Sequence, residues 1–329
     1  MTIILSAGNH SYVMQFSDRR LSGGGKIIEE HSNKATVFVC GNGRFSVGFT
    51  GLAKIPGFAF QPWLVDALGR CAPPDYGIMQ TAKRLLLELD LLFATHPGIR
   101  WLPSSYKRMT IMFSGYLYVE NQPFIGNLWI TNFQDFNALT DLDAAKPHFW
   151  VFAEREREKA PPPVTFIQRV GAWNAMTQED TEILRRVLET SGSLDTIVDA
   201  GVSVVRRIAN RPLSANTVGQ EVAISIIPRD SRQQPTSIVR LSTGSDSITL
   251  LDSVCAFPSP DGSPALMMVR DLKLEVQNPI AGKPALNATQ GPNERCWCKS
   301  GLKFKYCHGR AHLIVAPHPD DQLPSDSTG

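Results

Sequence analysis

The chain has 329 residues, of which 43% are apolar, a proportion typical of a globular protein with one large core or two modest ones. Lysine and arginine outnumber aspartate and glutamate by only 33 to 31, so the composition does not favour nucleic acid or an anionic membrane as the partner. No apolar run approaches the roughly 18 residues of a membrane-spanning helix, and the start lacks the features of a signal peptide. We therefore expect a cytoplasmic protein with no membrane partner.

Short β-rich runs separated by turn residues occupy the first part of the chain. We expect strands at 2–7, 12–16, 26–28, 34–40 and 44–50. Asn42-Gly43 lies between two of these runs and predicts a tight hairpin, because both central residues of such a turn need positive φ. The glycine-rich stretch 22–25 predicts another turn.

Two helical pairs follow, each after a group of strands. We expect helices at 63–71, 81–94, 177–190 and 194–209, and strands at 109–119, 126–130, 164–170 and 220–227. Thr177 with Asp180 three residues later predicts a capped helix start. The alternation of strand groups with helical pairs predicts the α+β class.

The rest of the chain differs in composition. A stretch at 229–279 is rich in Ser, Thr and Asp, has short β-like runs, and is interpreted as an appendage of open role. We expect a main domain at 2–228, a proline- and glycine-containing linker at 280–291, a knuckle at 292–310 and a disordered tail at 311–329.

Thr2 is small enough for removal of the initiator methionine to be expected, which would make it the amino terminus. A terminal threonine carries a nucleophilic hydroxyl beside an α-amine whose reference pKa of about 7.7 to 8.0 suits a general base. One residue can then supply both nucleophile and base.

Four segments in order, Thr2-Ile3-Ile4, Ser17-Asp18-Arg19-Arg20, Asn33-Lys34-Ala35 and Val47-Gly48-Phe49-Thr50-Gly51, resemble the proteasome β-subunit branch of the N-terminal nucleophile hydrolases. Asp18 and Lys34 lie 16 and 32 residues after Thr2, the separations of that family. The resemblance covers about residues 2–228 and implies a four-layer αββα sandwich.

The same resemblance implies roles for single residues. Thr2 would be the nucleophile, Lys34 would lower the pKa of its hydroxyl group, and Asp18 would hold Lys34 charged and oriented. The backbone N–H of Gly48 would stabilise the oxyanion. Six residues would line the specificity pocket: Leu21, Ser32, Thr36, Ser46, Thr50 and Lys54.

This chain departs from the family pattern at two supporting positions. Residues 171–174, Gly-Ala-Trp-Asn, contain no serine where the family has one. Ser214 stands where aspartate is expected, and Thr217 could replace a supporting serine hydroxyl. The individual residues also have ordinary structural interpretations, as a threonine in a first strand, an aspartate in a turn and a lysine at a strand edge.

Three cysteines and a histidine crowd the far carboxyl end. Cys296, Cys298, Cys307 and His308 form a complete Cys₃His set for one structural Zn²⁺ ion. Their order resembles the SEC-C motif over about 292–309. Neighbouring lysines make the knuckle basic, and the resemblance implies an acidic protein surface or nucleic acid as its partner, of which we expect a protein.

Taken together, the sequence predicts a threonine hydrolase that cleaves an amide bond in a peptide or protein substrate, with the knuckle recruiting substrate or a partner. The alternative is a catalytically inactive scaffold that acts as a protein- or nucleic-acid-binding adaptor through its knuckle. The resemblance also implies assembly into a homo-oligomer or ring.

Overall fold

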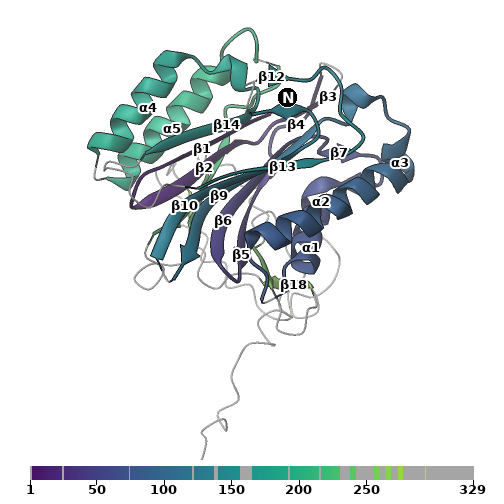
Figure 1. Ribbon diagram of the computed structural model, residues 1–329. Coiled ribbons are helices and arrows are strands. Elements are labelled where there is room, and N and C mark those ends of the chain that lie inside the picture. The colour runs from purple at the N-terminus through teal and green to yellow at the C-terminus, as the bar shows by residue number, and fades with distance from the viewer. Residues whose placement is uncertain are drawn as a thin grey trace, which may run out of the picture. The chain divides into compact units, whose positions relative to one another are not determined.

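Figure 1 shows the computed structural model of the chain. It describes residues 2–23, 26–73, 75–120, 122–136, 140–155, 165–191, 193–214 and 216–229, the backbones of four later strands, and residue 293. The chain divides into two units, Met1–Pro279 and Ile280–Gly329. All helices and strands of the described residues lie in the first unit.

The first sheet has six strands in the order β14-β1-β2-β15-β16-β19. Their bounds are Phe166–Gly171, Ile3–Gly8, Tyr12–Asp18, Val222–Pro228, Ile238–Leu241 and Lys273–Val276, in that order. Every pair is antiparallel except β16 with β19, which is parallel. All residues of β1 and β15 are buried, which explains their almost unbroken apolar sequences.

The second sheet has seven strands in the order β13-β10-β9-β6-β5-β17-β18. Their bounds are Trp150–Arg155, Gln122–Thr131, Met109–Val119, Gly43–Gly51, Ala35–Cys40, Cys255–Pro258 and Pro264–Met267. Three two-stranded ribbons complete the β structure: β3 (Leu21–Gly23) with β4 (Lys26–Glu29), β7 (Lys54–Ile55) with β8 (Phe58–Ala59), and β11 (Gln134–Asp135) with β12 (Thr140–Asp141).

The hairpin between β5 and β6 is present, but its turn lies one residue earlier than the Asn42-Gly43 dipeptide predicts. Cys40 pairs with Gly43, so Gly41 and Asn42 form the turn. Tertiary hydrogen bonds account for the shift, because the Gly41 N–H donates to the carbonyl of Tyr76 and Asn42 Oδ1 accepts from the N–H of Ile78 at 2.8 Å. The turn is thus tied to the start of a helix.

The helices are α1 (Phe60–Cys71), α2 (Ile78–Thr95), the short α3 (Pro97–Arg100), α4 (Gln178–Thr190) and α5 (Leu194–Ala209), with 3₁₀ turns at Ser104–Tyr106 (η1) and Trp173–Ala175 (η2). The predicted cap of α4 is confirmed. Thr177 Oγ1 accepts from the N–H of Asp180 at 3.3 Å, and Asp180 Oδ2 accepts from the N–H of Thr177 at 3.0 Å. Within the part of the chain that the structure describes, none of the helices is both long enough and apolar enough to cross a bilayer.

Each helical pair packs on its own sheet. Leu64 of α1 and Leu85 of α2 share a core with Phe45 and Phe113 of the second sheet. A separate core joins α4 and α5 to the first sheet, with Phe16 at its centre. The mixed α and β fold predicted from the sequence is confirmed.

Smaller clusters join the facing sides of the two sheets. One contains Val13 and Tyr116, and another contains Ile4 and Met112. Figure 1 shows the two sheets between the pair α4 and α5 and the pair α1 and α2. Thr2, Asp18 and Lys34 lie where β1 begins, β2 ends and β5 begins.

Candidate functional site

Thr2 and Asp18 lie side by side because the hairpin of β1 and β2 joins them. Ile4 pairs with Ser17, so Asp18 at the end of β2 reaches the first residue of β1. Asp18 Oδ1 accepts from the N–H of Ile3 at 2.9 Å, and the side chain is fully buried. The start of the chain is thereby fixed against the end of β2.

Lys34 reaches the same point from the second sheet, where it immediately precedes β5. Its side chain is inaccessible to solvent. Its Nζ donates to Thr2 Oγ1, to the carbonyl of Arg20, and to Asp18 Oδ2 at 3.2 Å. These three acceptors match the three hydrogens of an ammonium group, so the buried cation is fully hydrogen-bonded.

Asp18 holds the cluster together through both carboxylate oxygens. Besides Ile3 and Lys34, it accepts at Oδ2 from the N–H of Gly219 at 3.0 Å and from the N–H of Arg20 at 3.3 Å. A buried carboxylate requires such donors, because an unpaired buried charge is strongly destabilising. The strand β15, which follows Gly219, therefore takes part in positioning the site.

Burial lowers the pKa of Lys34 below its ordinary value. The charge and the hydrogen bond of Asp18 oppose this effect, whereas the nearby positive charges of Arg20 and Arg19 add to it. A lysine that gives up its proton more readily than usual, in contact with a threonine hydroxyl, favours proton exchange between the two groups.

The carbonyl of Thr2 is held by the segment that follows β14. Thr2 O accepts from the N–H of Ala172 at 2.8 Å and from Thr50 Oγ1 at 3.5 Å. Gly171 has φ of 85°, and a Cβ there would collide with the carbonyl oxygen of Thr2. Glycine is required here because of both its conformation and the close approach.

Trp173 extends this support to the ribbon of β11 and β12. Its Nε1 donates to Asp141 Oδ2 at 2.9 Å, and Asp141 Oδ1 accepts from Gln134 Nε2 at 2.9 Å. Residues 171–174 lack the serine of the resembling family, yet they fix the carbonyl of Thr2 by backbone contact. This hydrogen-bond chain could not be predicted from the sequence, since Gln134 and Asp141 stand in no recognisable pattern.

Gly48 lies away from the cluster, in the middle of β6 between Ala35 of β5 and Met112 of β9. A Cβ at Gly48 would meet Gln15 Oε1 at 2.6 Å, so this position faces the interior between the sheets. The N–H of Phe49 donates to Lys34 O at 3.2 Å. Since successive N–H groups of a strand point to opposite sides, the N–H of Gly48 points toward β9.

Gly51, three residues further on, lies beside Thr2. Its neighbour Thr50 contacts the carbonyl of Thr2, and Gly51 has φ of 110° and is exposed. By the same alternation, the N–H of Gly51 points to the Lys34 side of β6, beyond Ala35, the first residue of β5. A signal for Gly51 is present in the sequence, since the segment 47–51 contains two glycines, Gly48 and Gly51.

The side chain of Thr217 bonds within its own turn and not to Thr2. Thr217 Oγ1 donates to the carbonyl of Ser214 at 3.2 Å, and Ser214 itself is buried. This turn precedes Gly219, whose N–H binds Asp18. The structure therefore brings Thr2, Asp18 and Lys34 together and leaves Gly48 and Thr217 outside that cluster.

Three of the six predicted pocket residues, Leu21, Ser32 and Thr50, adjoin the cluster, and a fourth, Lys54, lies in β7. Thr50 contacts the carbonyl of Thr2, and Leu21 is buried in β3 directly after Arg20. Ser32 donates its N–H to the carbonyl of Arg19 at 2.9 Å. Lys54 is exposed, with its Nζ 3.3 Å from Glu29 Oε2.

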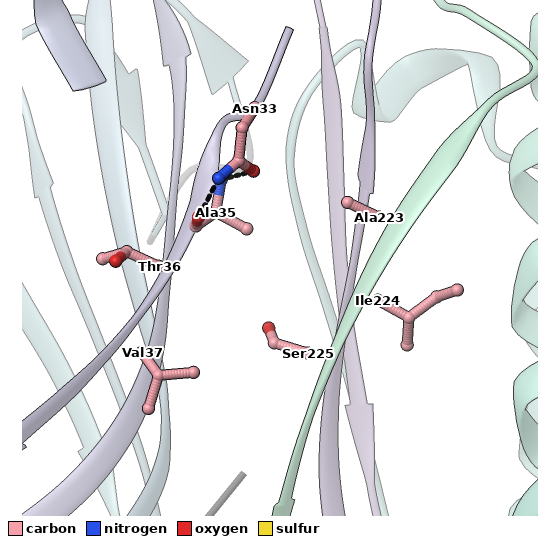
Figure 2. A pocket seen from close by; sticks show the side chains of 7 residues that line it. All are labelled: Asn33, Ala35, Thr36, Val37, Ala223, Ile224 and Ser225. Carbon is pink, nitrogen blue, oxygen red and sulfur yellow. Dashed lines mark hydrogen bonds between the residues drawn. The ribbon is translucent and has the colours of Figure 1, made fainter. Parts of the chain in front are cut away.

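Of the other two, Ser46 faces the space between the sheets, whereas Thr36 faces the opposite side of β5. Ser46 is fully buried and donates to Gln15 Oε1 at 3.0 Å. Thr36 borders a small hollow between β5 and β15, which Asn33, Ala35, Thr36, Val37, Ala223, Ile224 and Ser225 line. Figure 2 shows Ser225 pointing across this hollow toward β5, while Thr36 and Ile224 point away. Thr2 does not line it.

The predicted zinc ligands Cys296, Cys298, Cys307 and His308 lie outside the described residues. Their chemistry fits zinc, because three thiolates and one imidazole make a closed tetrahedral set. Among the residues that the structure does describe, no group of three or more His, Cys, Asp or Glu side chains could hold a metal ion.

Comparison with known proteins confirms the motif at this end of the chain. Residues 293–310 match the SEC-C motif. A comparison of the sequence with curated proteins found no match.

The solved structures that are similar to this chain include two Anbu proteins. Anbu (ancestral beta-subunit) from Yersinia bercovieri is 16% identical, with 70% of this chain and 85% of that chain covered and a TM-score of 0.42. The Anbu (Gly-1) mutant from Hyphomicrobium sp. strain MC1 is 12% identical, with 69% and 82% covered and a TM-score of 0.43. Scores of this size leave the function to be argued from the chain's own residues.

Proposed function

We propose that this chain is an N-terminal threonine hydrolase that cleaves an amide bond in a peptide or protein, with Thr2 as nucleophile once the residue before it has been removed. The observation that carries the proposal is the hydrogen bond from Lys34 Nζ to Thr2 Oγ1 inside a buried cluster with Asp18. A threonine hydroxyl in contact with a lysine of lowered pKa is an activated nucleophile.

The chemical steps follow from these groups. The free α-amine of Thr2 accepts the hydroxyl proton while Oγ1 forms a bond to the substrate carbonyl carbon. The C–N bond then breaks, and the leaving amine takes the proton from the α-ammonium group. Water adds to the resulting ester, gives up a proton to the same α-amine, and releases the acid and the threonine hydroxyl.

Lys34 acts in these steps through its charge and its hydrogen bond. Its cation stabilises negative charge that develops on Oγ1, and Asp18 keeps Nζ directed at that oxygen. The bond from Nζ to the carbonyl of Arg20 fixes the third hydrogen, so the ammonium group has one orientation.

For the oxyanion we favour the backbone N–H of Gly51 over that of Gly48. The geometry of β6 supports this choice, because the N–H of Gly48 points toward β9, whereas that of Gly51 points to the Lys34 side of the strand. A preorganised donor of this kind is worth about 2.7 to 4 kcal/mol in the transition state.

The proposal extends to the architecture and to the knuckle. We assign the two sheets and the helical pairs outside them to the four-layer αββα sandwich of the N-terminal nucleophile hydrolases. The SEC-C motif would hold one structural zinc through Cys296, Cys298, Cys307 and His308 and recruit a protein partner or the substrate. All four positions are protein ligands, so the metal stabilises the local fold and leaves catalysis to Thr2.

The test is covalent labelling by a peptide epoxyketone, which needs both the hydroxyl and the free α-amine of a terminal threonine. Intact mass of the purified full-length protein reports whether the residue before Thr2 is absent. We expect one label per chain for the wild type, located at Thr2, and none for Thr2→Ala or Lys34→Ala. Lys83→Ala on the exposed face of α2 is the matched lysine control and should label like the wild type.

A terminal but inert Thr2, or a retained preceding residue, would refute the hydrolase. It would then favour the alternative of a non-catalytic adaptor that binds its partner through the SEC-C motif.

A further inference from the structure

A run of basic and aromatic residues stands exposed between α2 and β9. Residues 96–108, called here the basic rim, contain Arg100, Lys107 and Arg108 and no acidic residue. Trp101 is 78% exposed and Tyr106 is 57% exposed, the two large aromatic side chains in this run. Exposed apolar and aromatic surface of this extent is characteristic of binding sites.

The basic rim is an ordered surface. Lys107 Nζ donates to the carbonyl of Arg100 at 2.7 Å, which closes the run on itself. The Arg100 guanidinium carbon lies 4.9 Å from the centre of the Trp101 ring, a cation–π distance. Arg108 Nε donates to the carbonyl of Ser105 at 3.2 Å. A ligand would therefore meet groups that are already oriented, which reduces the entropy cost of binding.

The rim lies at the same end of the sheets as Thr2. The N–H of Leu52 donates to the carbonyl of Arg108 at 3.2 Å, and Gly51 pairs with Met109 at the start of β9. Thr50 in turn contacts the carbonyl of Thr2. In Figure 1, α3 and β7 lie toward the end of the sheets that bears the N-terminal label. A chain bound across Thr2 could thus extend along the rim.

Among the described residues, no acidic side chain forms an ion pair with Arg100, Lys107 or Arg108. Glu29 pairs with Lys54 at 3.3 Å, and Asp141 is engaged by Trp173 and Gln134. The segment next to η1 carries exposed Asp143 together with exposed Lys146, whose charges offset each other. The rim therefore keeps an excess of positive charge.

We propose that the basic rim binds an acidic, extended segment of the substrate. Carboxylates accept charge-assisted hydrogen bonds from guanidinium and ammonium groups, and the guanidinium fork suits them in particular. Trp101 and Tyr106 supply rigid contact area beside these cations. This inference rests on the proposed function in one respect, that the acidic segment belongs to a chain cleaved at Thr2.

Single-stranded nucleic acid would use similar stacking and charge. The near balance of charge over the whole chain, formally +2, favours the peptide.

The experiment measures binding separately from catalysis. Full-length Thr2→Ala protein is titrated against a short fluorescein-labelled peptide that alternates Glu and Gly, the matched peptide of Lys and Gly, and an oligothymidylate of equal length. Fluorescence anisotropy should report saturable binding of the Glu peptide, weakening as salt rises, and none of the Lys peptide. Changing Arg100→Glu and Lys107→Glu together should weaken binding at least about tenfold, because two attractive charges become repulsive.

Two further variants make the result specific. Trp101→Ala keeps the charge of the rim and should weaken binding of the Glu peptide by a smaller factor than the double charge change does. Arg185 and Arg186 are exposed on α4, and changing both to Glu makes the same change of charge elsewhere. This variant should bind the Glu peptide with a Kd within about twofold of the Thr2→Ala protein.

Failure of the Glu peptide to bind, an equal loss in the α4 control, or tighter binding of oligothymidylate that depends on the rim would each overturn the proposal. Epoxyketone labelling separates the two claims. Labelling without peptide binding refutes the acidic preference alone, whereas peptide binding without labelling leaves a basic docking surface for acidic peptides and refutes the hydrolase.

Discussion

Replacing Asp18 by Asn tests whether a single buried carboxylate organises the site. Asp18 Oδ1 accepts from the N–H of Ile3, and Oδ2 accepts from Lys34, Gly219 and Arg20. Asparagine has the same shape but only one acceptor oxygen. If that oxygen stays with Ile3, the amide NH₂ group faces three donors and the ammonium group of Lys34 loses its counter-ion.

The expected cost is large compared with the stability of an ordinary domain. Leaving one partner of a buried ion pair uncompensated costs about 3 to 5 kcal/mol, and each buried donor left unsatisfied costs about 1 to 3 kcal/mol. Rotation of the amide and loss of the Lys34 proton relieve part of this, so we expect Asp18→Asn to lower the free energy of unfolding by about 3 to 5 kcal/mol. Since domains are typically stable by about 5 to 15 kcal/mol, the variant should fold with little reserve.

Urea unfolding at pH 7, followed by tryptophan fluorescence, measures the loss. Asp199→Asn on the exposed face of α5 is the matched control and should change the free energy of unfolding by less than about 0.5 kcal/mol. The dependence of that free energy on urea should stay equal in all three proteins, so that midpoints can be compared. A loss below about 1 kcal/mol for Asp18→Asn would show that the cluster does not depend on this carboxylate.

Three further predictions concern Lys34, Trp173 and the motif. Burial lowers the pKa of Lys34, so between this lowered pKa and the unfolded value of about 10.4 the unfolded chain binds more protons than the folded chain. The free energy of unfolding therefore rises with pH across that window. Lys34→Met should remove this part of the rise, measured by urea unfolding at several pH values, and an unchanged slope of that free energy against pH would contradict the prediction. Trp173→Phe removes the donor to Asp141 and should lower the free energy of unfolding by about 1 to 2 kcal/mol, measured by thermal unfolding. An unaltered midpoint would mean that this hydrogen bond does not stabilise the fold. We expect about one zinc ion per chain in the wild type, measured by mass spectrometry of metals. Cys298→Ser should abolish this zinc without changing the epoxyketone labelling of Thr2, and retained zinc would refute the ligand set.

Periodic elements could be predicted closely from the sequence. The structure has β9 at Met109–Val119 and α5 at Leu194–Ala209, both at the predicted bounds, because their apolar residues repeat with one clear period over the whole element. The proximity of Thr2 and Asp18 also follows from local sequence, since two adjacent strands with a short turn between them pair antiparallel. The position of Lys34 beside Thr2 could be predicted only from the family resemblance, because Lys34 belongs to the other sheet.

Counting along the motif predicts Gly48 as the oxyanion donor, whereas the geometry of the turn leads us to favour Gly51. The β5–β6 hairpin turns at Gly41 and Asn42, and β6 then runs through Gly48 to Gly51 before it leaves the sheet. The residue beside Thr2 is therefore set by the length of that hairpin, which contacts with Tyr76 and Ile78 determine. Ser46, predicted for a pocket, faces Gln15 between the sheets, because its neighbours Phe45 and Val47 face the helices and side chains alternate along a strand.

The buried cluster itself discriminates between an enzyme and a scaffold. Taking a lysine and an aspartate out of water costs free energy that their mutual attraction seldom recovers, and apolar residues of similar volume often stabilise a fold as well or better. Packing the two sheets therefore gives no reason to place Lys34 and Asp18 here. A lysine whose pKa is lowered, held by three acceptors of which one is the hydroxyl of Thr2, suits a hydroxyl that reacts. A scaffold would gain stability by losing this cluster, so its presence supports the hydrolase over the adaptor.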